Sequence, residues 1–187
     1  RNDILNISAV ADAAHEAGVP LIVDNTVASP FLCRPLEHGA DIVVHSATKF
    51  IGGHGTSIGG IIVDGGSFDF GDAEKFPGFN EPDESYNGLT FWPSLGHGSY
   101  ILKARLQWLR DTGAAISPFN AFMMLQGLET LSLRMERHVS NAQAVVEFLD
   151  AHDQVERVNY AGLAGSPWAE HAAKYVPAGA GSVPSFV

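Results

Sequence analysis

The stretch that most constrains this chain runs from Leu21 to Gly60, where two short apolar runs each end in polar residues. The runs, Leu21–Val23 and Ile42–Val44, are short and continuously apolar, which is typical of buried parallel strands. The polar residues that follow them are Asp24-Asn25-Thr26 and His45-Ser46-Ala47-Thr48-Lys49. Ligands of open α/β sheets bind at the carboxyl ends of the strands, so we expect a ligand site here.

These polar residues suit a phosphorylated, cationic cofactor that carries a carbonyl group. Ser46 and Thr48 are two positions apart, so in an extended chain their hydroxyls would face the same way and hold a phosphate together. Lys49 can form a Schiff base with an aldehyde. Asp24 can pair with a protonated ring nitrogen and keep the ring an electron sink. Pyridoxal 5'-phosphate needs all three functions; Thr26 either packs locally or orients Asp24 or the ring.

Each of these residues also has an ordinary structural interpretation. A lysine is usually a surface residue, and Asp24 alone would be a strand-end cap. Ser46 and Thr48 would otherwise form a local Ser/Thr turn. The position of Lys49 at a strand end, before the glycine-rich turn Gly52–Gly55, favours the cofactor site. That turn has the wrong spacing for a dinucleotide fingerprint and lacks the G-K-[ST] of a Walker motif.

Helix and strand patterns alternate through the first third of the chain. A first helix is predicted from apolar residues at helical spacing, capped by Asn6 or Asp3 and stopped by Gly18. Strands are predicted over residues 21–24, 41–45 and 58–63. This alternation predicts an α/β fold with a mostly parallel sheet and flanking helices.

The pattern changes after Val63. Residues 67–93 lack periodicity but are rich in aromatic residues, so we interpret them as an ordered excursion that covers the site or meets a neighbouring subunit. Helices are predicted over about 98–110, from Ser117-Pro118 and over about 130–151, then a strand over 155–159 and a helix near 168–175. We expect residues 1–150 to belong to a large cofactor-binding domain and residues 151–187 to begin a smaller α+β C-terminal domain.

Composition narrows the classes of function. The chain has 21 acidic and 11 basic residues, a formal charge of −10 and no Lys/Arg cluster, which argues against nucleic-acid binding. The histidines show no metal-ligand spacing, so no metal is expected. His45 and His54 are close to the predicted cofactor site in sequence and are either functional there or, as we favour, satisfied structural histidines. The single cysteine, Cys33, is interpreted as structural rather than catalytic.

Two further interpretations concern location and surface. No apolar run approaches the roughly 20 residues of a membrane span and no signal peptide precedes the first helix, so we expect no membrane association and a cytoplasmic location. Arg134, Arg137 and His138 are interpreted as a solvated or subunit-facing stripe on the long predicted helix.

The motifs DNTVASP and SATKFIGGHG resemble the cofactor region of the cystathionine γ-synthase/methionine γ-lyase family of fold-type I PLP-dependent transferases. EPDESYNGLTFW and LRDTGAAISPFNAFMMLQGLETLSLRMERH are similar to the O-acetylhomoserine sulfhydrylase branch. The resemblance implies that Lys49 carries the cofactor and that Asp24 contacts the pyridine nitrogen. It also implies a parent enzyme more than twice this length, a homotetramer of dimers with shared sites. Since the chain begins at Arg1, we expect an internal fragment.

The activity that the resemblance implies is γ-replacement on O-acetyl-L-homoserine. Sulfide or a thiol would replace the acetyl group, giving homocysteine or methionine plus acetate. One alternative is the related chemistry of a cystathionine γ-synthase or methionine γ-lyase, against which the aromatic segment 67–93 argues. The other is an inactive structural fragment, because the family's ring-stacking tyrosine and the arginine that binds the substrate carboxylate cannot be assigned in these residues.

Overall fold

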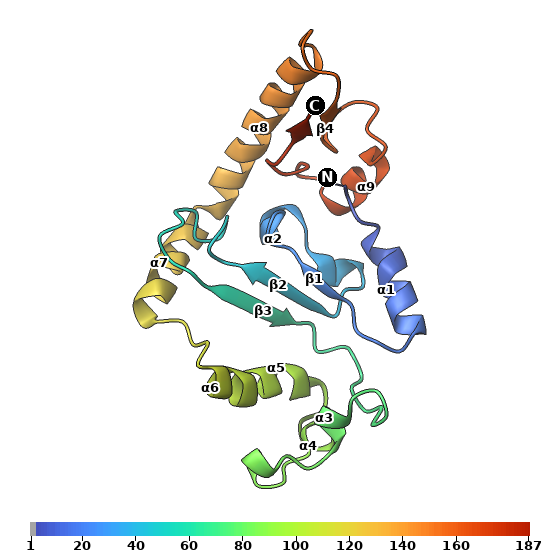
Figure 1. Ribbon diagram of the computed structural model, residues 1–187, viewed down its shortest axis with the longest axis vertical. Coiled ribbons are helices and arrows are strands. Elements are labelled where there is room, and N and C mark those ends of the chain that lie inside the picture. The colour runs from blue at the N-terminus through green and yellow to red at the C-terminus, as the bar shows by residue number, and fades with distance from the viewer. Residues whose placement is uncertain (1–2) are drawn as a thin grey trace.

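The computed structural model describes residues 3–187, and a three-stranded sheet lies at its centre (Figure 1). The strands are β1 (Ile22–Asp24), β2 (Ile42–Ser46) and β3 (Gly60–Asp64), in the order β1-β2-β3. β1 and β2 are parallel, whereas β2 and β3 are antiparallel. The two predicted apolar runs are therefore neighbouring parallel strands, and their carboxyl ends meet at one edge of the sheet.

The antiparallel pairing of β3 corrects the expectation of a mostly parallel sheet for this part of the chain. A parallel return needs a crossover of a dozen or more residues, usually through a helix. Residues 47–59 instead form turns, in which the Gly52 N–H donates to the Ala47 carbonyl at 2.8 Å. The chain therefore folds back beside β2, and Ser46 lies opposite Gly60.

The first helix, α1 (Ile7–Glu16), begins and ends as predicted. The Asn6 side chain caps it by accepting a hydrogen bond from the Ala9 N–H at 3.2 Å. Gly18 follows in the left-handed region at φ +66°, which a glycine adopts at no steric cost. A short helix α2 (Ser29–Leu32) and a 3₁₀ turn (Pro35–His38) then connect β1 to β2.

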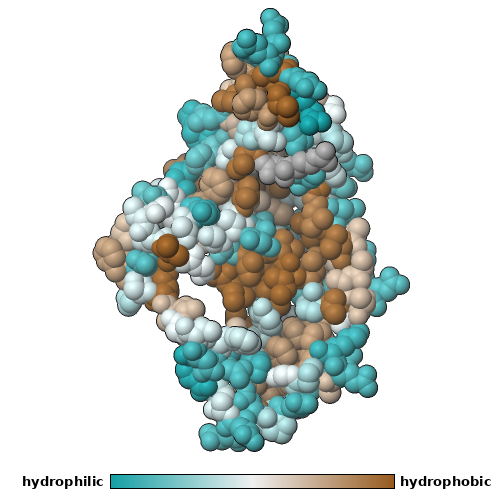
Figure 2. Space-filling model, in the orientation of Figure 1, coloured by the Kyte–Doolittle hydropathy of each residue, from teal (hydrophilic) through white to brown (hydrophobic). Residues whose placement is uncertain are grey.

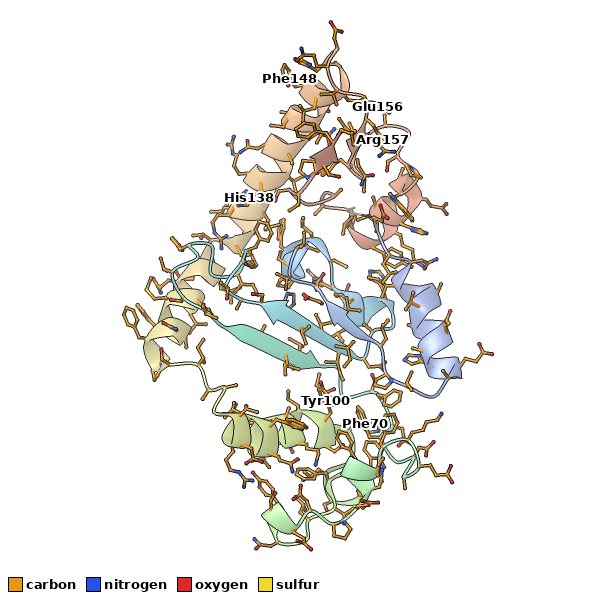
Figure 3. All side chains as sticks on the ribbon, viewed as in Figure 1. Phe70, Tyr100, His138, Phe148, Glu156 and Arg157 are labelled. Atoms are coloured by element: carbon orange, nitrogen blue, oxygen red, sulfur yellow. The ribbon has the colours of Figure 1, made fainter. Side chains whose placement is uncertain are left out.

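The predicted excursion after Val63 is ordered around an aromatic cluster. The Phe70 ring, 5% exposed, stacks on Phe79 at 4.6 Å and on Tyr100 at 5.6 Å between ring centroids; Figure 3 labels Phe70 and Tyr100. The helices of this part are α3 (Pro77–Asn80), α4 (Phe91–Leu95), α5 (Ser99–Lys103) and α6 (Leu109–Thr112), with a π-helical turn (Ala104–Trp108) between the last two.

Two helices then lead to the C-terminal part. The helix α7 (Pro118–Glu129) starts at the predicted Ser117-Pro118, where the Ser117 hydroxyl accepts from the Asn120 N–H at 3.1 Å. The long helix α8 (Leu131–Asp150) follows almost at once and runs away from the sheet (Figure 1). The elements beyond it are β4 (Val158–Asn159), α9 (Ala169–Tyr175) and β5 (Ser185–Phe186), with β4 and β5 antiparallel. The domain boundary near residue 150 stays a prediction, and residues 1–2 of the predicted first domain lie outside the described residues.

The main core joins the two ends of the described chain. Tyr175 of α9 is 1% exposed, and its hydroxyl donates to Asn6 Oδ1 at 2.6 Å beside the start of α1. Met135 of α8 is fully buried in the same cluster. The remaining buried members are Ile7, Leu32, Cys33, Ala40, Leu131 and Val176. This core fixes α8 and α9 against the segment that carries β1.

The sheet itself is incompletely covered. Ile61, Ile62 and Val63 of β3 are between 38% and 49% exposed, and Figure 2 shows hydrophobic surface gathered over the sheet. Among residues 3–187, no helix has both the length and the apolar character that crossing a bilayer requires.

Candidate cofactor site

The carboxyl ends of β1 and β2 are tied together through Thr26. The Thr26 hydroxyl donates to Asp24 Oδ1 at 2.6 Å and accepts from the Ser46 N–H at 2.7 Å. The Thr26 N–H donates to the same Asp24 oxygen at 3.0 Å. The structure thus brings together three of the predicted site residues, one from each strand end and one that bridges them.

Asp24 is a solvent-exposed carboxylate that stays ionised. The hydrogen bonds from the Thr26 hydroxyl and then from its N–H hold the pKa of Asp24 below its ordinary value of 3.8, against the opposing effect of burial. Both bonds converge on Oδ1, and Oδ2 takes no part in them. An oriented anion of this kind fits a protonated ring nitrogen.

The asparagine of the D-N-T motif has a structural task. Asn25 is 5% exposed, and its amide donates to the Ser29 carbonyl at 3.1 Å and to the Cys33 carbonyl at 2.8 Å. Its own N–H donates to the Val44 carbonyl at 2.9 Å and so extends the β1–β2 pairing by one residue. Asn25 therefore fixes both the strand end and the short helix α2 around Asp24.

Lys49 lies in the turn that follows β2. Its N–H donates to the Ser46 carbonyl at 3.2 Å, and its carbonyl accepts from the Gly53 N–H at 2.8 Å. The side chain is exposed, and none of the ion pairs among residues 3–187 involves it. An accessible amine on a hydrogen-bonded turn fits covalent attachment of an aldehyde.

The Thr48 hydroxyl, which we expected to hold a phosphate together with Ser46, is hydrogen-bonded to Gly59 instead. Its hydroxyl donates to the Gly59 carbonyl at 3.2 Å and accepts from the Gly59 N–H at 3.0 Å. These bonds fasten the turn to the residue that precedes β3, which is a structural task. A phosphate contact by Thr48 would have to share this hydroxyl.

The two histidines near the site differ from one another. His54 is satisfied as expected, since its Nδ1 lies 2.8 Å from the Gly52 carbonyl oxygen. His45 is 6% exposed, and its Nδ1 has no hydrogen-bond partner among residues 3–187, so it is not the satisfied residue we expected. Burial lowers the pKa of His45, which keeps the ring neutral.

Arg134 lies at the site rather than on the solvated or subunit-facing stripe that its sequence context predicts. Its guanidinium donates to the carbonyls of Phe50 at 2.7 Å and Ile51 at 3.2 Å. These are the two residues directly after Lys49. No local pattern could have identified the contact, because it joins positions 84 and 83 residues apart.

Two hollows lie beside the strand ends. One, of about 240 Å³, is lined by Asp24, Asn25 and Cys33 together with Tyr175 of α9. The other, of about 1060 Å³, is lined by His45, by the start of β3 and by α5. Of the predicted site residues, Asp24 lines the smaller hollow, so a small molecule in it can reach this carboxylate.

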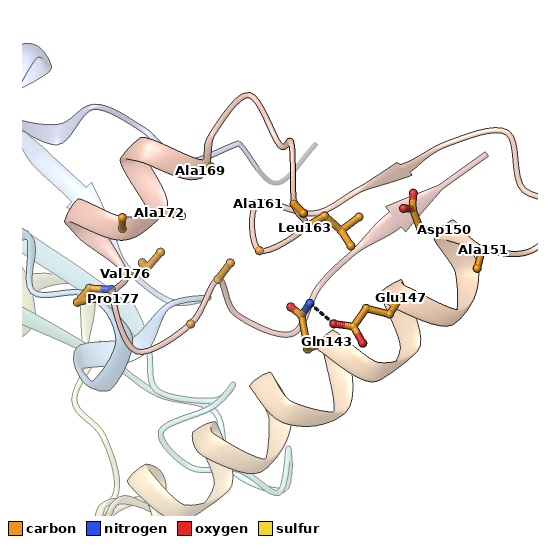
Figure 4. Close-up of a pocket in the computed structure, with 15 residues that line it drawn as sticks. Gln143, Glu147, Asp150, Ala151, Ala161, Leu163, Ala169, Ala172, Val176 and Pro177 are labelled. Atoms are coloured by element: carbon orange, nitrogen blue, oxygen red, sulfur yellow. Dashed lines mark hydrogen bonds between the residues drawn. The ribbon is translucent and has the colours of Figure 1, made fainter.

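A third cavity, of about 760 Å³, lies between α8 and the C-terminal segment (Figure 4). Most of its lining residues are small and apolar, and on its α8 side Gln143 donates to Glu147 at 2.6 Å. It contains none of the predicted site residues, so it is separate from the cofactor site.

Comparison with known proteins gives the class: these are the motifs and the fold of a PLP-dependent enzyme. The chain belongs to the family described as Cys/Met metabolism PLP-dependent enzymes, which matches residues 1–187. The α/β fold class is confirmed by a solved structure, described as an O-acetylhomoserine (thiol)-lyase from Campylobacter jejuni, with a TM-score of 0.91 and 37% identity over 97% of this chain. That structure carries N'-pyridoxyl-lysine-5'-monophosphate. Pyridoxal 5'-phosphate is therefore the cofactor of this family, as predicted.

The relatives agree with the branch that the motifs indicated. An O-acetyl-L-homoserine sulfhydrylase from Leptospira meyeri is 61% identical over 86% of this chain. A homocysteine synthase from Schizosaccharomyces pombe is 52% identical over 95%, and an O-acetyl-L-homoserine sulfhydrylase from Corynebacterium glutamicum is 53% identical over 89%. The matched region spans only 38%, 42% and 39% of these relatives, and 45% of the solved chain.

Proposed function

We propose that this chain forms part of the cofactor site of an enzyme that replaces the γ-substituent of O-acetyl-L-homoserine with sulfide or a thiol. The products are homocysteine or methionine, and acetate. The observation that carries the proposal is the strand-end network of Asp24, Thr26 and Ser46 beside the turn of Lys49. The names of the relatives, O-acetyl-L-homoserine sulfhydrylase and homocysteine synthase, supply the reaction.

Each residue has a role in this proposal. Lys49 Nζ is the covalent attachment point and, once substrate frees it, carries protons between the substrate's Cα and Cβ. The Asp24 carboxylate holds the ring nitrogen protonated, and Thr26 keeps that carboxylate ionised and oriented. Ser46 and Thr48 contribute hydroxyls toward the phosphate. When bound, pyridoxal phosphate supplies an aldehyde for the lysine and a ring that withdraws electrons from the substrate.

The assembly belongs to the proposal as well. The enzyme is a homotetramer built from two dimers, in which neighbouring subunits share the active sites, and it is located in the cytoplasm. Residues 151–187 open a C-terminal domain that follows α8. The relatives are more than twice as long as the region that this chain matches, which fits a site completed by other parts of such an enzyme.

The test uses the full natural protein supplied with pyridoxal phosphate. Borohydride reduction followed by peptide mass spectrometry should place a pyridoxyl group on Lys49, and the Lys49→Ala variant should carry none at any lysine. Incubation of the unmodified protein with O-acetyl-L-homoserine and sulfide should then release homocysteine and acetate.

The same assay separates the alternatives. Formation of cystathionine from L-cysteine at a higher rate would indicate a cystathionine γ-synthase, and breakdown of methionine to a 2-oxo acid would indicate a lyase. Absence of both label and product would reduce the chain to an inactive structural remnant and overturn the proposal.

A further inference from the structure

We propose that Arg134, on the long helix α8, is a positioning residue that sets the place of Lys49 in the cofactor site. The inference rests on the proposed function only in taking Lys49 as the attachment point. Its basis is a set of contacts between α8 and the turn that carries Lys49. None of these contacts involves the Lys49 side chain.

The Arg134 guanidinium serves three backbone carbonyls at once. Nη1 donates to Phe50 at 2.7 Å, while Nη2 donates to Ile51 at 3.2 Å and to Gly127 at 2.6 Å. Nε donates to the Thr130 hydroxyl at 3.1 Å, which fixes the plane of the fork. A planar guanidinium can serve several acceptors in this way, whereas a lysine ammonium cannot reproduce the geometry.

Arg134 links the turn after Lys49 to the end of α7. The Gly127 carbonyl lies near the end of α7 and accepts from the Thr130 N–H at 3.3 Å as well as from Arg134 Nη2 at 2.6 Å. A cation is also favoured at this end of a helix by the helix dipole. Phe50 and Ile51 lie in the turn after β2, and no strand among residues 3–187 pairs with this turn. One side chain therefore holds the turn and the helix junction together.

The packing at this junction leaves the turn no room to move inward. A Cβ on Gly127 would lie 2.2 Å from the Gly52 carbonyl oxygen, so the two backbones are in direct contact. A Cβ on Gly53, which has φ +77°, would lie 2.7 Å from Arg134 Nη1. The Phe50 ring also packs edge-on against His138 of α8, with centroids 5.5 Å apart. Every residue from Phe50 to Gly53 is thus fixed by α7, by α8 or by a turn hydrogen bond.

The position of the Lys49 backbone follows from these contacts. Its carbonyl bonds to the Gly53 N–H, and its neighbour Phe50 bonds to Arg134. Without Arg134 the carbonyls of Phe50 and Ile51 lose their donors, and the turn is free to shift away from α8. The Lys49 amine then moves relative to Asp24, and misplacement of a reacting group by about 1 Å can slow a reaction about 100-fold.

The variant that tests this is Arg134→Lys in the full natural protein, with Arg137→Lys as its matched control. Arg137 lies one turn further along α8, is exposed and makes no ion pair among residues 3–187. Thr130→Val is a milder second variant that removes the acceptor of Arg134 Nε, together with the long bond from the Thr130 hydroxyl to the Gly127 carbonyl at 3.4 Å. It carries the test if Arg134→Lys does not fold.

Three readouts are needed. We expect Arg134→Lys to lower kcat by about 10- to 100-fold, from displacement of the reacting amine. In the protein with cofactor bound to the lysine, it should also shift the pH midpoint of the visible absorbance. In the cofactor-free protein, it should speed hydrogen exchange at the Gly52 and Gly53 amides. Thr130→Val should change all three in the same direction but less, and Arg137→Lys should stay within about twofold of the parent.

An unchanged pH midpoint and unchanged amide exchange in Arg134→Lys, with only a lower thermal midpoint, would show a purely structural role and overturn the inference. A parent protein that binds the cofactor without turning over O-acetyl-L-homoserine would instead contradict the proposed reaction. In that case absorbance and exchange would still decide the role of Arg134. Amide hydrogen exchange tests the role of Arg134 even in a protein that does not bind the cofactor.

Discussion

Thr26 Oγ1 lies 2.6 Å from Asp24 Oδ1 and donates its hydrogen to that oxygen. The same hydroxyl accepts from the Ser46 N–H on the neighbouring strand. A threonine that sequence alone left between a packing role and an orienting role thus contacts the carboxylate directly, which favours the orienting role.

Replacing Thr26 by valine should raise the pKa of Asp24 toward its ordinary value of 3.8, because the hydroxyl is the largest cause of its depression. A Thr26→Ser variant keeps the hydroxyl and should keep the low pKa. Titration of the Asp24 carboxyl ¹³C resonance in aspartate-labelled protein measures both. The valine variant should also bind pyridoxal phosphate about 10- to 150-fold more weakly, the effect of one lost hydrogen bond to a charged group. Equal pKa values in the two variants would show that Thr26 does not control Asp24.

Cys33 should be nearly unreactive while the protein is folded. The thiol is 6% exposed, and burial raises its pKa to about 11 from an ordinary value of 9.0. At pH 8 it then holds about 100-fold less thiolate than an ordinary cysteine, and thiolate is the reactive form. Iodoacetamide should therefore label Cys33 rapidly in urea and very slowly in buffer. Comparable rates in both would contradict the structural interpretation of this cysteine.

Tyr160→Phe should destabilise the C-terminal part of the protein. The Tyr160 side chain is 4% exposed, and its hydroxyl donates to the Gly181 carbonyl at 2.7 Å. Removing the donor leaves a buried carbonyl unpaired, at a cost of about 1–2 kcal/mol in the free energy of unfolding. The urea midpoint at pH 8 measures this loss.

The same pair of proteins should converge in stability at high pH. Burial raises the pKa of folded Tyr160 above its ordinary value of 10.0. Its contribution is therefore complete below the unfolded value near pH 10 and is lost as the pH rises through the folded value. The difference in urea midpoint between the parent and Tyr160→Phe should shrink above pH 10. A constant difference would mean that Tyr160 does not titrate with unfolding.

The local features of the fold could be predicted because local chemistry determines them. The cap at Asn6, the stop at Gly18 and the start of α7 at Ser117 each depend on residues within one turn. The strand ends that carry Asp24 and Ser46 follow from apolar runs that stop. These are signals that a single sequence contains.

The remaining features depend on contacts between distant parts of the chain. The direction of β3 depends on how residues 47–59 turn, and this segment has no hydrophobic periodicity from which its structure could be predicted. The engagement of Thr48 by Gly59 depends on the same turn. In the sequence, Arg134 has polar neighbours on a predicted helix, as a surface residue would. Its hydrogen bonds to the Phe50 and Ile51 carbonyls depend on how α8 packs against the Lys49 turn, which the sequence does not show.

The close contact between α7 and the Lys49 turn gives a last prediction, in which sterics and helix propensity oppose one another. Glycine inside a helix normally costs about 0.5–1 kcal/mol relative to alanine, so Gly127→Ala would be stabilising on propensity alone. The new Cβ would however lie 2.2 Å from the Gly52 carbonyl oxygen, which is backbone and cannot rotate away. We expect steric strain to win and the variant to lose about 2–3 kcal/mol of unfolding free energy. Gly78→Ala in α3 is the control, because its nearest neighbour is the flexible Lys103 side chain at 4.0 Å. Urea unfolding of both variants measures which effect is larger. A Gly127→Ala protein as stable as Gly78→Ala would mean that the turn can move away from α7. Lys49 would then be less tightly placed than these contacts indicate.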